Sequence, residues 1–501
     1  MLSAFSALSA RKHLEQRSAF LWHDALASLV VFLVALPLCV GVAVASGVPG
    51  ELGLVTGIVG GLVVGALPGS TLQVSGPAAG LTVLVYNAVE RFGLGTLGAL
   101  VLIAGLLQVL LGALRFGRWF RAISVAVVHG MLTGIGLILV LGQIYVMAGA
   151  DQPSGGPGKL AGTAELLGTI ALDRTARTAF LVGLGTLAVL VLWPKVSGRA
   201  RIVPGPLVAV TLAIAATSLL DLPVATVEVR GLLDAVQPPG GGALGELLSA
   251  QALGTIVAFT LIASAESLFS AAAVDRMHNG PRTDYDKELM AQGVGNTLCG
   301  ALGALPMTAV IVRSAANVQA GARTSLSRIL HGLWLLLFAA LLPAAIGVIP
   351  LPALAGVLVH AGCKLIPVKE FLPMWRQHRG EVVILGATAV AVVMTDLLEG
   401  VLLGLLLSVC KAAWETSRLQ VETREYDDGR VVVALTGNAT FLRLPGTLEQ
   451  LEGLPTDRPV EVDLSGVRHA DLASCVALEN WARRHHDAGT APVRLLPPAQ
   501  P

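Results

Sequence analysis

Charged side chains are scarce in this sequence, and their scarcity excludes an ordinary soluble protein. Asp, Glu, Lys and Arg make up 13% of the 501 residues, whereas 54% are hydrophobic and the mean hydropathy is +0.74. A typical soluble domain carries about a quarter charged residues. The chain cannot cover itself with water-facing side chains, so we expect a lipid bilayer around most of it.

An excess of positive charge and any pattern of cysteines are also missing. The formal net charge is +1, whereas a nucleic-acid partner requires a concentrated surplus of Lys and Arg, so none is predicted. The five cysteines show no ligand-like spacing: Cys39, Cys299, Cys363, Cys410 and Cys475. We therefore predict no disulfide framework, no metal site and no cofactor. The sequence also lacks the nucleophile and cofactor motifs that are typical of enzymes.

Apolar runs recur from about residue 26 to about residue 413, each long enough to cross or half cross a hydrocarbon core of ~30 Å. In lipid, only a helix satisfies its own backbone without a second segment, so the runs predict helices. The fourteen expected spans are about 26–46, 53–66, 77–89, 95–114, 123–146, 179–196, 205–221, 252–273, 289–302, 306–320, 329–348, 351–366, 381–395 and 399–413.

The basic residues of the short loops predict the orientation of the spans, because Lys and Arg concentrate on the cytoplasmic side. Basic clusters follow the fourth, sixth, eighth, tenth and twelfth spans, so all fall on one side. They are Arg115, Arg118 and Arg121; Lys195, Arg199 and Arg201; Arg276, Arg282 and Lys287; Arg323 and Arg328; and Lys364, Lys369, Arg376 and Arg379. We expect a multi-pass protein of the inner (plasma) membrane with both termini cytoplasmic and a short cytoplasmic segment at residues 1–24.

Two spans are short and open with a break, at Ser75-Gly76-Pro77 and at Leu305-Pro306. Pro37 and Pro77 are 40 residues apart, and so are Glu266 and Pro306. Each half therefore has its break at the same distance from a marked residue in an earlier span. Short interrupted segments in matching positions of two halves indicate the binding site of a transporter. About seven helices in each half would also give the halves opposite topology, the inverted-repeat arrangement.

After about residue 415 the pattern changes to that of a small α/β domain. Strands are predicted at Arg430–Leu435, Val460–Leu464 and near Val493, a loop and helix at Asn438–Leu451, and an amphipathic helix at Asp471–His485. We assign residues 25–414 to the membrane and residues 415–501 to a cytoplasmic domain.

Several motifs resemble those of the SulP anion transporters, the solute carrier 26 family. They are Gly69–Thr82 (GSTLQVSGPAAGLT), Ala263–Ala271 (ASAESLFSA), Gly293–Asn296 (GVGN), Leu305–Thr308 (LPMT), Arg313–Asn317 (RSAAN) and Gly321–Thr324 (GART). Further on, Glu461–Val467 (EVDLSGV) followed by Asp471 resembles the core of a STAS domain, which these transporters carry at the C-terminus.

The resemblance implies an α-helical membrane fold of 14 transmembrane segments in 7+7 inverted repeats, with core and gate domains, a cytoplasmic STAS domain and a possible homodimer. On this chain the core would cover about 25–114 and 252–348, and the gate about 123–221 and 351–413. One departure matters: signalling relatives of the STAS module carry a phosphorylatable Ser after the conserved Asp, whereas Leu472 stands here. Control by phosphorylation at that position is therefore not expected in this chain.

Glu266 is the first candidate functional residue. A carboxylate midway along an apolar span costs ~2.5–3.5 kcal/mol on the lenient insertion scale, so it is retained for an interior partner, an ion path or a proton. Burial disfavours its charged form, which suits a group that takes up and releases protons. The alternative is a structural carboxylate that is paired with Arg313 or capped by a nearby backbone amide.

The substrate site is expected where the two broken helices meet, because helix N-termini offer unpaired N–H groups and a partial positive charge. Arg313 would add a fixed charge on the anion's route, or would act as a gate or salt-bridge partner. The candidate substrate-binding residues are Gln73, Ser75, Gly76, Pro77, Ala78, Ser267, Pro306, Met307, Thr308 and Ala309.

These features predict a secondary active transporter of small inorganic or organic anions of the dicarboxylate, bicarbonate or sulfate class, coupled to protons by symport. An uncoupled exchanger or channel uses the same fold. A membrane sensor that signals through the soluble domain is a third hypothesis. Helix dipoles attract any small anion, so the physics of the site leaves the substrate open.

Overall fold

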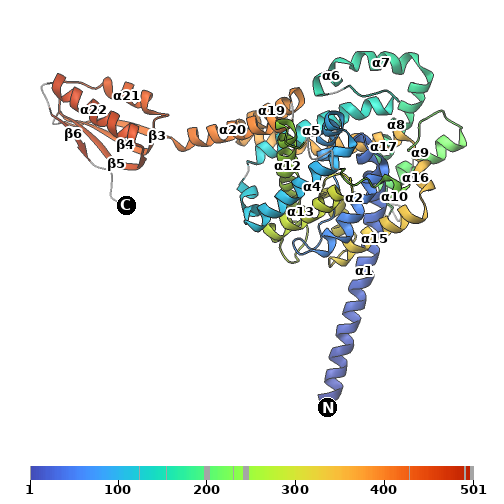
Figure 1. Cartoon of the computed structure of the whole chain (residues 1–501). Coiled ribbons are helices and arrows are strands. Elements are labelled where there is room, and N and C mark those ends of the chain that lie inside the picture. The colour runs from blue at the N-terminus through green and yellow to red at the C-terminus, as the bar shows by residue number, and fades with distance from the viewer. Residues whose placement is uncertain are drawn as a thin grey trace. The chain divides into compact units, whose positions relative to one another are not determined.

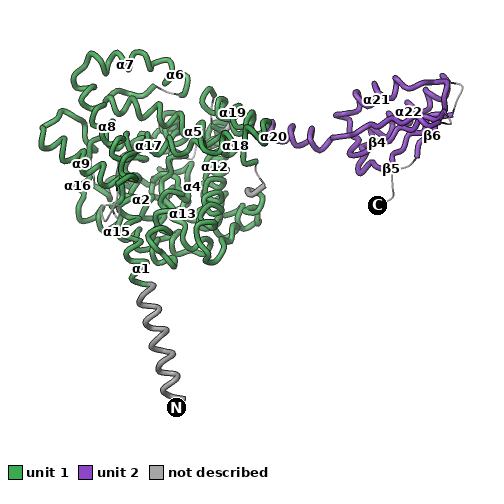
Figure 2. Tube along the Cα trace, turned by 180° about the vertical axis from the view of Figure 1, so that it is seen from behind, with its two compact units in different colours: residues 1–404 green, residues 405–501 purple. Residues whose placement is uncertain are grey.

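The computed structural model describes residues 2–122, 124–153, 155–196, 203–228, 231–240, 247–395, 397–427, 429–489 and 492–496. The chain forms two compact units, residues 1–404 and 405–501, which Figure 2 distinguishes by colour. Arg199 and Arg201, two of the basic residues that predict the orientation, lie outside the described residues.

Unit 1 is built of helices, and each of the fourteen expected spans coincides with one (Figure 1). These helices are α1 (Leu2–Ala45), α2 (Gly50–Leu62), α3 (Thr82–Phe92), α4 (Leu94–Ala113), α5 (Val125–Met147), α8 (Arg174–Leu192), α9 (Gly205–Leu219), α12 (Ala250–Val274), α13 (Tyr285–Ala301), α14 (Ile311–Gln319), α15 (Leu326–Leu341), α17 (Leu351–Leu365), α19 (Arg379–Met394) and α20 (Leu397–Thr416). Helix α20 continues past residue 404 into unit 2.

Shorter helices connect these spans. They are η1 (Val64–Ala66), η2 (Ala79–Leu81), η3 (Phe116–Ala122), α6 (Gly155–Ala161), α7 (Thr163–Leu172), η4 (Trp193–Lys195), α10 (Leu232–Ala235), α16 (Ala344–Gly347) and α18 (Val368–Gln377). Within the described ranges, six helices are long and apolar enough to cross a bilayer by length and composition: Leu21–Ala45, Leu94–Ala113, Val125–Met147, Arg174–Lys195, Ala250–Val274 and Leu351–Gln377.

Glycines allow several of these helices to pack with their backbones close together. A Cβ on Gly61 of α2 would lie 2.7 Å from the backbone nitrogen of Gly332 in α15. A Cβ on Gly293 of α13 would lie 2.6 Å from the backbone nitrogen of Val109 in α4. Lipid supplies no hydrophobic driving force between helices, so their association depends on close van der Waals packing, which small residues allow. Gly61 and Gly293 therefore serve close packing of helices.

The two interrupted spans differ from the expectation at their first residues. The helices begin at Thr82 and Ile311, and not at Pro77 and Pro306. The residues before them form two short strands, β1 (Ser75–Pro77) and β2 (Met307–Ala309), which pair with each other. A proline disfavours the helical conformation in the residue before it, here Gly76 and Leu305. The pairing of β1 with β2 accounts for the extended backbone of the residues around these prolines.

Unit 2 contains a four-stranded sheet with the order β3-β4-β5-β6 and two helices (Figure 1). Its elements are β3 (Leu419–Glu425), β4 (Val431–Ala439), α21 (Leu444–Glu452), β5 (Val460–Ala470), α22 (Leu472–Ala488) and β6 (Val493–Leu496). The expected small α/β domain is confirmed. The sequence prediction missed β3, because an edge strand with mostly exposed polar side chains carries little hydrophobic pattern.

Candidate functional site

The two interrupted spans meet in the interior of unit 1. Strands β1 and β2 run antiparallel, with Ser75 opposite Ala309, Gly76 opposite Thr308 and Pro77 opposite Met307. The three residues of each strand are buried. Segments more than 230 residues apart in sequence thus share one ladder, and the antiparallel direction is the one that an inverted repeat produces.

The side chain of Asn296, from α13, holds strand β2 in place. Its Oδ1 accepts the backbone N–H of Met307 at 2.7 Å, and its Nδ2 donates to the carbonyl oxygen of Met307 at 3.1 Å. Nδ2 also donates to Oε1 of Gln108 at 2.7 Å, and Gln108 Nε2 donates to Ser264 Oγ at 3.1 Å. All four residues are buried. Asn296 lies in one of the motifs that resemble the family, but nothing in the sequence alone predicts its role.

Two predicted substrate-binding residues also brace the strands. Ser267 Oγ, from α12, accepts the backbone N–H of Ala309 at 3.2 Å. Gln73 Nε2 donates to the carbonyl oxygen of Ser267 at 3.0 Å, while Gln73 Oε1 is buried without a hydrogen-bond partner among the described residues. The observed contacts of both side chains therefore position the backbone around the helix tips.

No side chain caps the N-terminus of α3 or of α14. η2 runs directly into α3, so the N–H of Thr82 already donates to the carbonyl oxygen of Ala79, and the tip at β1 begins with η2 after the uncapped Ala78. Thr82, the first residue of α3, is 3% exposed, and its hydroxyl has no partner within the described ranges. Uncapped first turns carry the partial positive charge that attracts an anion. Sequence spacing did not single out Thr82 as a preferred site residue, because a threonine in an apolar span more often serves packing.

Glu266 projects from the middle of α12 toward the segment that joins β1 to α3. A Cβ on Gly80 would lie 2.7 Å from Glu266 Oε2 and 2.8 Å from Oε1, so any other residue at position 80 would require the carboxylate to move. The side chain of Thr308 in β2 lies beside it. Oε2 is buried and has no hydrogen-bond partner in the described part of the chain. The carboxylate is therefore close to both broken segments.

Arg313 is the third residue of α14, not two turns into the helix as expected from the sequence. It is 1% exposed, and its Nη2 donates to the carbonyl oxygen of Pro77 at 3.2 Å. Nε and Nη1 have no partner among the residues that the structure describes. The structure forms no ion pair between Arg313 and Glu266 within those residues, so the salt-bridge alternative is wrong for this conformation. The guanidinium lies behind β1, where a Cβ on Gly76 would overlap it.

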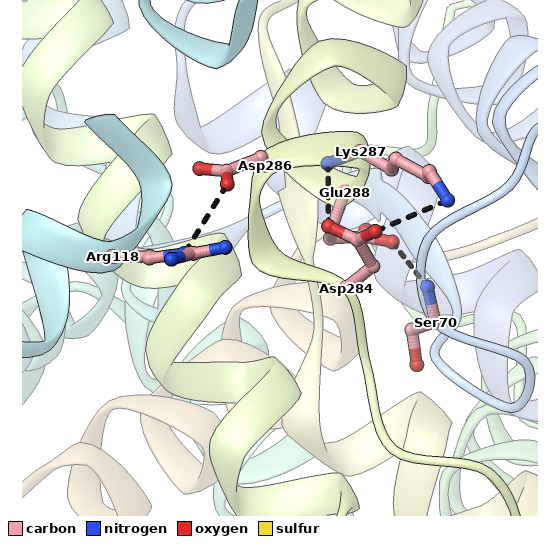
Figure 3. A network of polar contacts seen from close by, with 6 residues as sticks. All are labelled: Ser70, Arg118, Asp284, Asp286, Lys287 and Glu288. Atoms are coloured by element: carbon pink, nitrogen blue, oxygen red, sulfur yellow. Dashed lines mark hydrogen bonds and ion pairs between the residues drawn. The ribbon is translucent and has the colours of Figure 1, made fainter. Parts of the chain in front are cut away.

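A second polar network ties the start of α13 to the segment before β1 (Figure 3). Glu288 is 1% exposed; its Oε2 accepts the backbone N–H of Ser70 at 2.8 Å, and its Oε1 accepts Gln292 Nε2 at 2.8 Å. Gln292 Nε2 also lies 2.6 Å from Ser75 Oγ, so the network reaches strand β1. Nearby, Lys287 pairs with Asp284 at 3.1 Å. Glu288 directly precedes the expected span 289–302, so its burial could not be predicted from the sequence.

The remaining predicted residues lie in the same place. Ala78 follows β1 and is 2% exposed, and Pro306 directly precedes β2. No group of three or more His, Cys, Asp or Glu side chains suited to a metal ion is present in the described part of the chain. The arrangement thus offers two helix tips, one fixed cation and one carboxylate, all inside a helical membrane unit.

An inverted-repeat fold with broken helices that meet inside the membrane is typical of secondary transporters. The chain belongs to the Sulfate permease family, whose sequence profile matches residues 21–388. It is an anion transporter and not an enzyme.

Curated relatives agree with this family. The chain is 28% identical to the putative sulfate transporter YvdB of Bacillus subtilis, over 77% of this chain and 72% of the relative. It is 25% identical to the bicarbonate transporter BicA of a Picosynechococcus strain, over 91% and 85%.

Solved structures share the fold. The transmembrane domain of a cyanobacterial bicarbonate transporter BicA matches with a TM-score of 0.66 and 23% identity, over 76% of this chain and 97% of that one. Murine Slc26a9 in an inward-facing state matches with a TM-score of 0.77 and 16% identity, over 95% and 85%. The fold of the membrane unit and of the C-terminal STAS domain is thereby established.

Proposed function

We propose that this protein is a proton-coupled symporter that moves a small anion by alternating access. The anion binds between the first turns of α3 and α14, and Glu266 carries the proton. The observation that supports the proposal most directly is the meeting of two uncapped helix tips at the β1–β2 ladder, beside a buried carboxylate with an unpartnered oxygen.

The charges around the tips favour an anion. Buried Arg313 leaves Nε and Nη1 without partners among the described residues, so its charge is not cancelled by a carboxylate there. An uncompensated buried cation is costly, and a bound anion at the nearby helix tips offsets that cost. Arg313 is held against β1 by its hydrogen bond to the carbonyl oxygen of Pro77, and its proposed action on the anion is through its electric field.

Glu266 fits a proton carrier. Its carboxylate borders Gly80 and Thr308, which belong to the segments that form the tips. When it is charged, it repels an anion at the tips; when it is protonated, it does not. Binding of the anion therefore favours uptake of the proton, and thermodynamic linkage makes the proton favour the anion equally.

Two moving parts are proposed from the packing of the helices. Helices α1, α2 and α15 contact one another and, with α4, α12 and α13, surround the β1–β2 ladder. Helix α5 contacts α17 and α19, and α8 contacts α9 and α17. These groups correspond to a core at about 25–114 and 252–348 and a gate at about 123–221 and 351–413. Rocking of one group against the other exposes the tips to either side.

The relatives narrow the substrate class. Their names specify sulfate and bicarbonate, which are small oxyanions. We propose an oxyanion of this kind, with dicarboxylates such as fumarate as the wider class. The basic loops support cytoplasmic termini in the plasma membrane, and a homodimer is proposed from the family resemblance.

Uptake into liposomes tests this function. Sulfate, bicarbonate and fumarate are supplied with and without an inward proton gradient, to wild-type protein, Glu266→Gln and the exposed control Glu165→Gln. We expect the gradient to accelerate wild type and Glu165→Gln by roughly tenfold per pH unit at most, and to leave Glu266→Gln unaffected.

Each alternative gives a different result. Wild-type uptake that ignores the gradient and requires an anion inside indicates an exchanger. A large conductance without saturation indicates a channel. A gradient response that survives in Glu266→Gln contradicts the role of this carboxylate, and no uptake of any of the three anions contradicts the substrate class.

A further inference from the structure

A small cavity lies between α3 and α5, next to the tip of α3. It is lined by Ala45, Thr82, Val83, Tyr86, Ile138, Leu139, Gly142, Gln143, Gln152 and Lys159. The space accommodates about one water molecule. The lining residues come from both groups of helices proposed to move against each other, so the cavity changes size when they move.

The cavity lies on the side of unit 1 that carries the turn between α1 and α2. A Cβ on Gly47 in that turn would lie 3.4 Å from the ring of Tyr86, which is one turn beyond Thr82 in α3. The basic loops lie on the other side, since α1 crosses once from the N-terminus to this turn. The cavity therefore lies near the proposed exterior side of unit 1.

Lys159, in α6, places a buried cation at this cavity. The residue is 4% exposed, and its ammonium nitrogen lies 5.5 Å from the centre of the Tyr86 ring. Within the described residues it forms no ion pair. Glu90 is close enough to influence the ammonium group and lies 3.3 Å from the Tyr86 hydroxyl. Burial lowers the pKa of Lys159, and the Glu90 carboxylate opposes that effect.

A buried ammonium group without an ion-pair partner is costly, and a ring face compensates only part of the lost hydration. The other polar groups at the cavity are also available to a ligand. Thr82 Oγ1 has no partner among the described residues, and the side chain of Gln143 is 3% exposed. Gln152 brings its amide to the same wall, because a Cβ on Gly142 would meet its Oε1 at 2.5 Å.

We propose that Lys159, with Gln143, Gln152 and Thr82, forms an outer binding position for the transported oxyanion on its way to the helix tips. In this structure the Tyr86 ring and Glu90 lie near the ammonium group. When α3 and α5 separate, the anion replaces them. Thr82 belongs to both the outer position and the tip of α3. The anion therefore keeps at least one polar partner while it moves from one to the other.

This inference rests on the proposed function as an anion symporter, and kinetics separate the two. Loss of Lys159 weakens attraction of the anion from outside but leaves the proton site intact. We expect Lys159→Gln to raise the apparent KM for external sulfate by about tenfold or more, as for loss of a charge-assisted hydrogen bond, with the maximal rate and the response to a proton gradient unchanged. Lys159→Arg should restore most of the affinity, and the exposed control Lys195→Gln should match wild type.

Thiol labelling tests the position directly. Lys159→Cys is prepared in a background in which the exposed Cys363, Cys410 and Cys475 are Ser. A membrane-impermeant methanethiosulfonate applied from outside should label Cys at 159, and sodium sulfate should slow the labelling. A cationic reagent should lower the raised KM, and an anionic reagent should raise it further.

Several outcomes overturn the inference. One is an unchanged KM in Lys159→Gln. Another is labelling that external sulfate does not slow. A third is a fall in maximal rate at constant KM, which assigns Lys159 a latch role between the helices instead. Should Lys159→Gln fail to fold, Gln143→Leu provides the same measurement at the opposite wall of the cavity.

Discussion

Gly80 has no side chain, and this absence matters as much to the proposed site as the side chains that form it. The space that a Cβ would take at Gly80 is occupied by the Glu266 carboxylate, with Oε2 at 2.7 Å and Oε1 at 2.8 Å. We expect Gly80→Ala to displace the carboxylate and reduce proton-driven uptake by tenfold or more, with a modest loss of stability. The measurements are uptake under a proton gradient and the melting temperature.

The matched control is Gly254→Ala on the same helix as Glu266, where a Cβ meets no atom within 4 Å. That variant should transport like wild type and melt at a slightly higher temperature, because alanine favours the helix by about 1 kcal/mol. Normal coupling in Gly80→Ala would show that the carboxylate does not need its present place.

Arg313 carries the second prediction at the scale of the residue. Because its charge is buried and acts on the helix tips, Arg313→Gln should weaken binding of sulfate by about tenfold or more, measured by titration calorimetry of the purified protein. Arg323→Gln, which changes an exposed arginine shortly after α14, is the control. Equal affinity in the two variants would remove Arg313 from the anion's electrostatic environment.

Among the elements, strand β2 depends on one side chain from α13. Asn296→Ala leaves the N–H and carbonyl oxygen of Met307 without their partners in a buried place. We expect a loss of about 1–3 kcal/mol of stability for the unsatisfied groups, seen as a lower melting temperature, together with slower uptake. Thr297→Ala, whose hydroxyl bonds only within its own helix, should have a much smaller effect on both measurements. An unaltered melting temperature in Asn296→Ala would show that the ladder does not need this brace.

The elements also show what the sequence could predict. Hydropathy alone located the fourteen helices, because an apolar run of sufficient length has few other solutions in lipid. It did not locate β1 and β2, because a strand of three residues has no hydrophobic pattern of its own. These strands form only because the two segments pair, with Ser75 opposite Ala309. The contacts of Asn296 and Gly80 were equally hidden, because they depend on partners far away in sequence.

Helix α22 of unit 2 provides a prediction on pH. Its N-cap, Asp471, accepts the backbone N–H of Ser474 at 2.8 Å and that of Phe441 at 2.7 Å. The hydrogen bond from Ser474, followed by that from Phe441, lowers the pKa of Asp471. Because the folded pKa lies below the unfolded value of about 3.9, the stabilisation is complete above that value and is lost as the pH falls through the folded pKa.

We expect Asp471→Asn to flatten this acid-side loss, measured by thermal unfolding of residues 405–501 between about pH 6 and pH 2. The exposed Asp457→Asn serves as the control. A steep loss of stability that persists unchanged in Asp471→Asn would assign the acid sensitivity of the domain to other carboxylates.

At the scale of the whole molecule, the division into two units allows the transporter hypothesis to be tested against the sensor hypothesis. Unit 1 contains the helix tips, Glu266 and Arg313, and unit 2 has its own hydrophobic core around Val433, Val462 and Trp481. We expect a chain that ends after residue 416 to retain proton-driven uptake in liposomes, within about a factor of three once corrected for the amount reconstituted. Complete loss of uptake with a folded membrane unit would favour the sensor hypothesis.

The ladder between β1 and β2 has one further consequence for the whole molecule. Hydrogen bonds bind the two tips to each other, so neither can be displaced while its partner stays behind. The anion would then bind to the same site whether it arrives from outside or from the cytoplasm. Selectivity among anions should be identical for import and export, and only the driving force should decide the direction of flow.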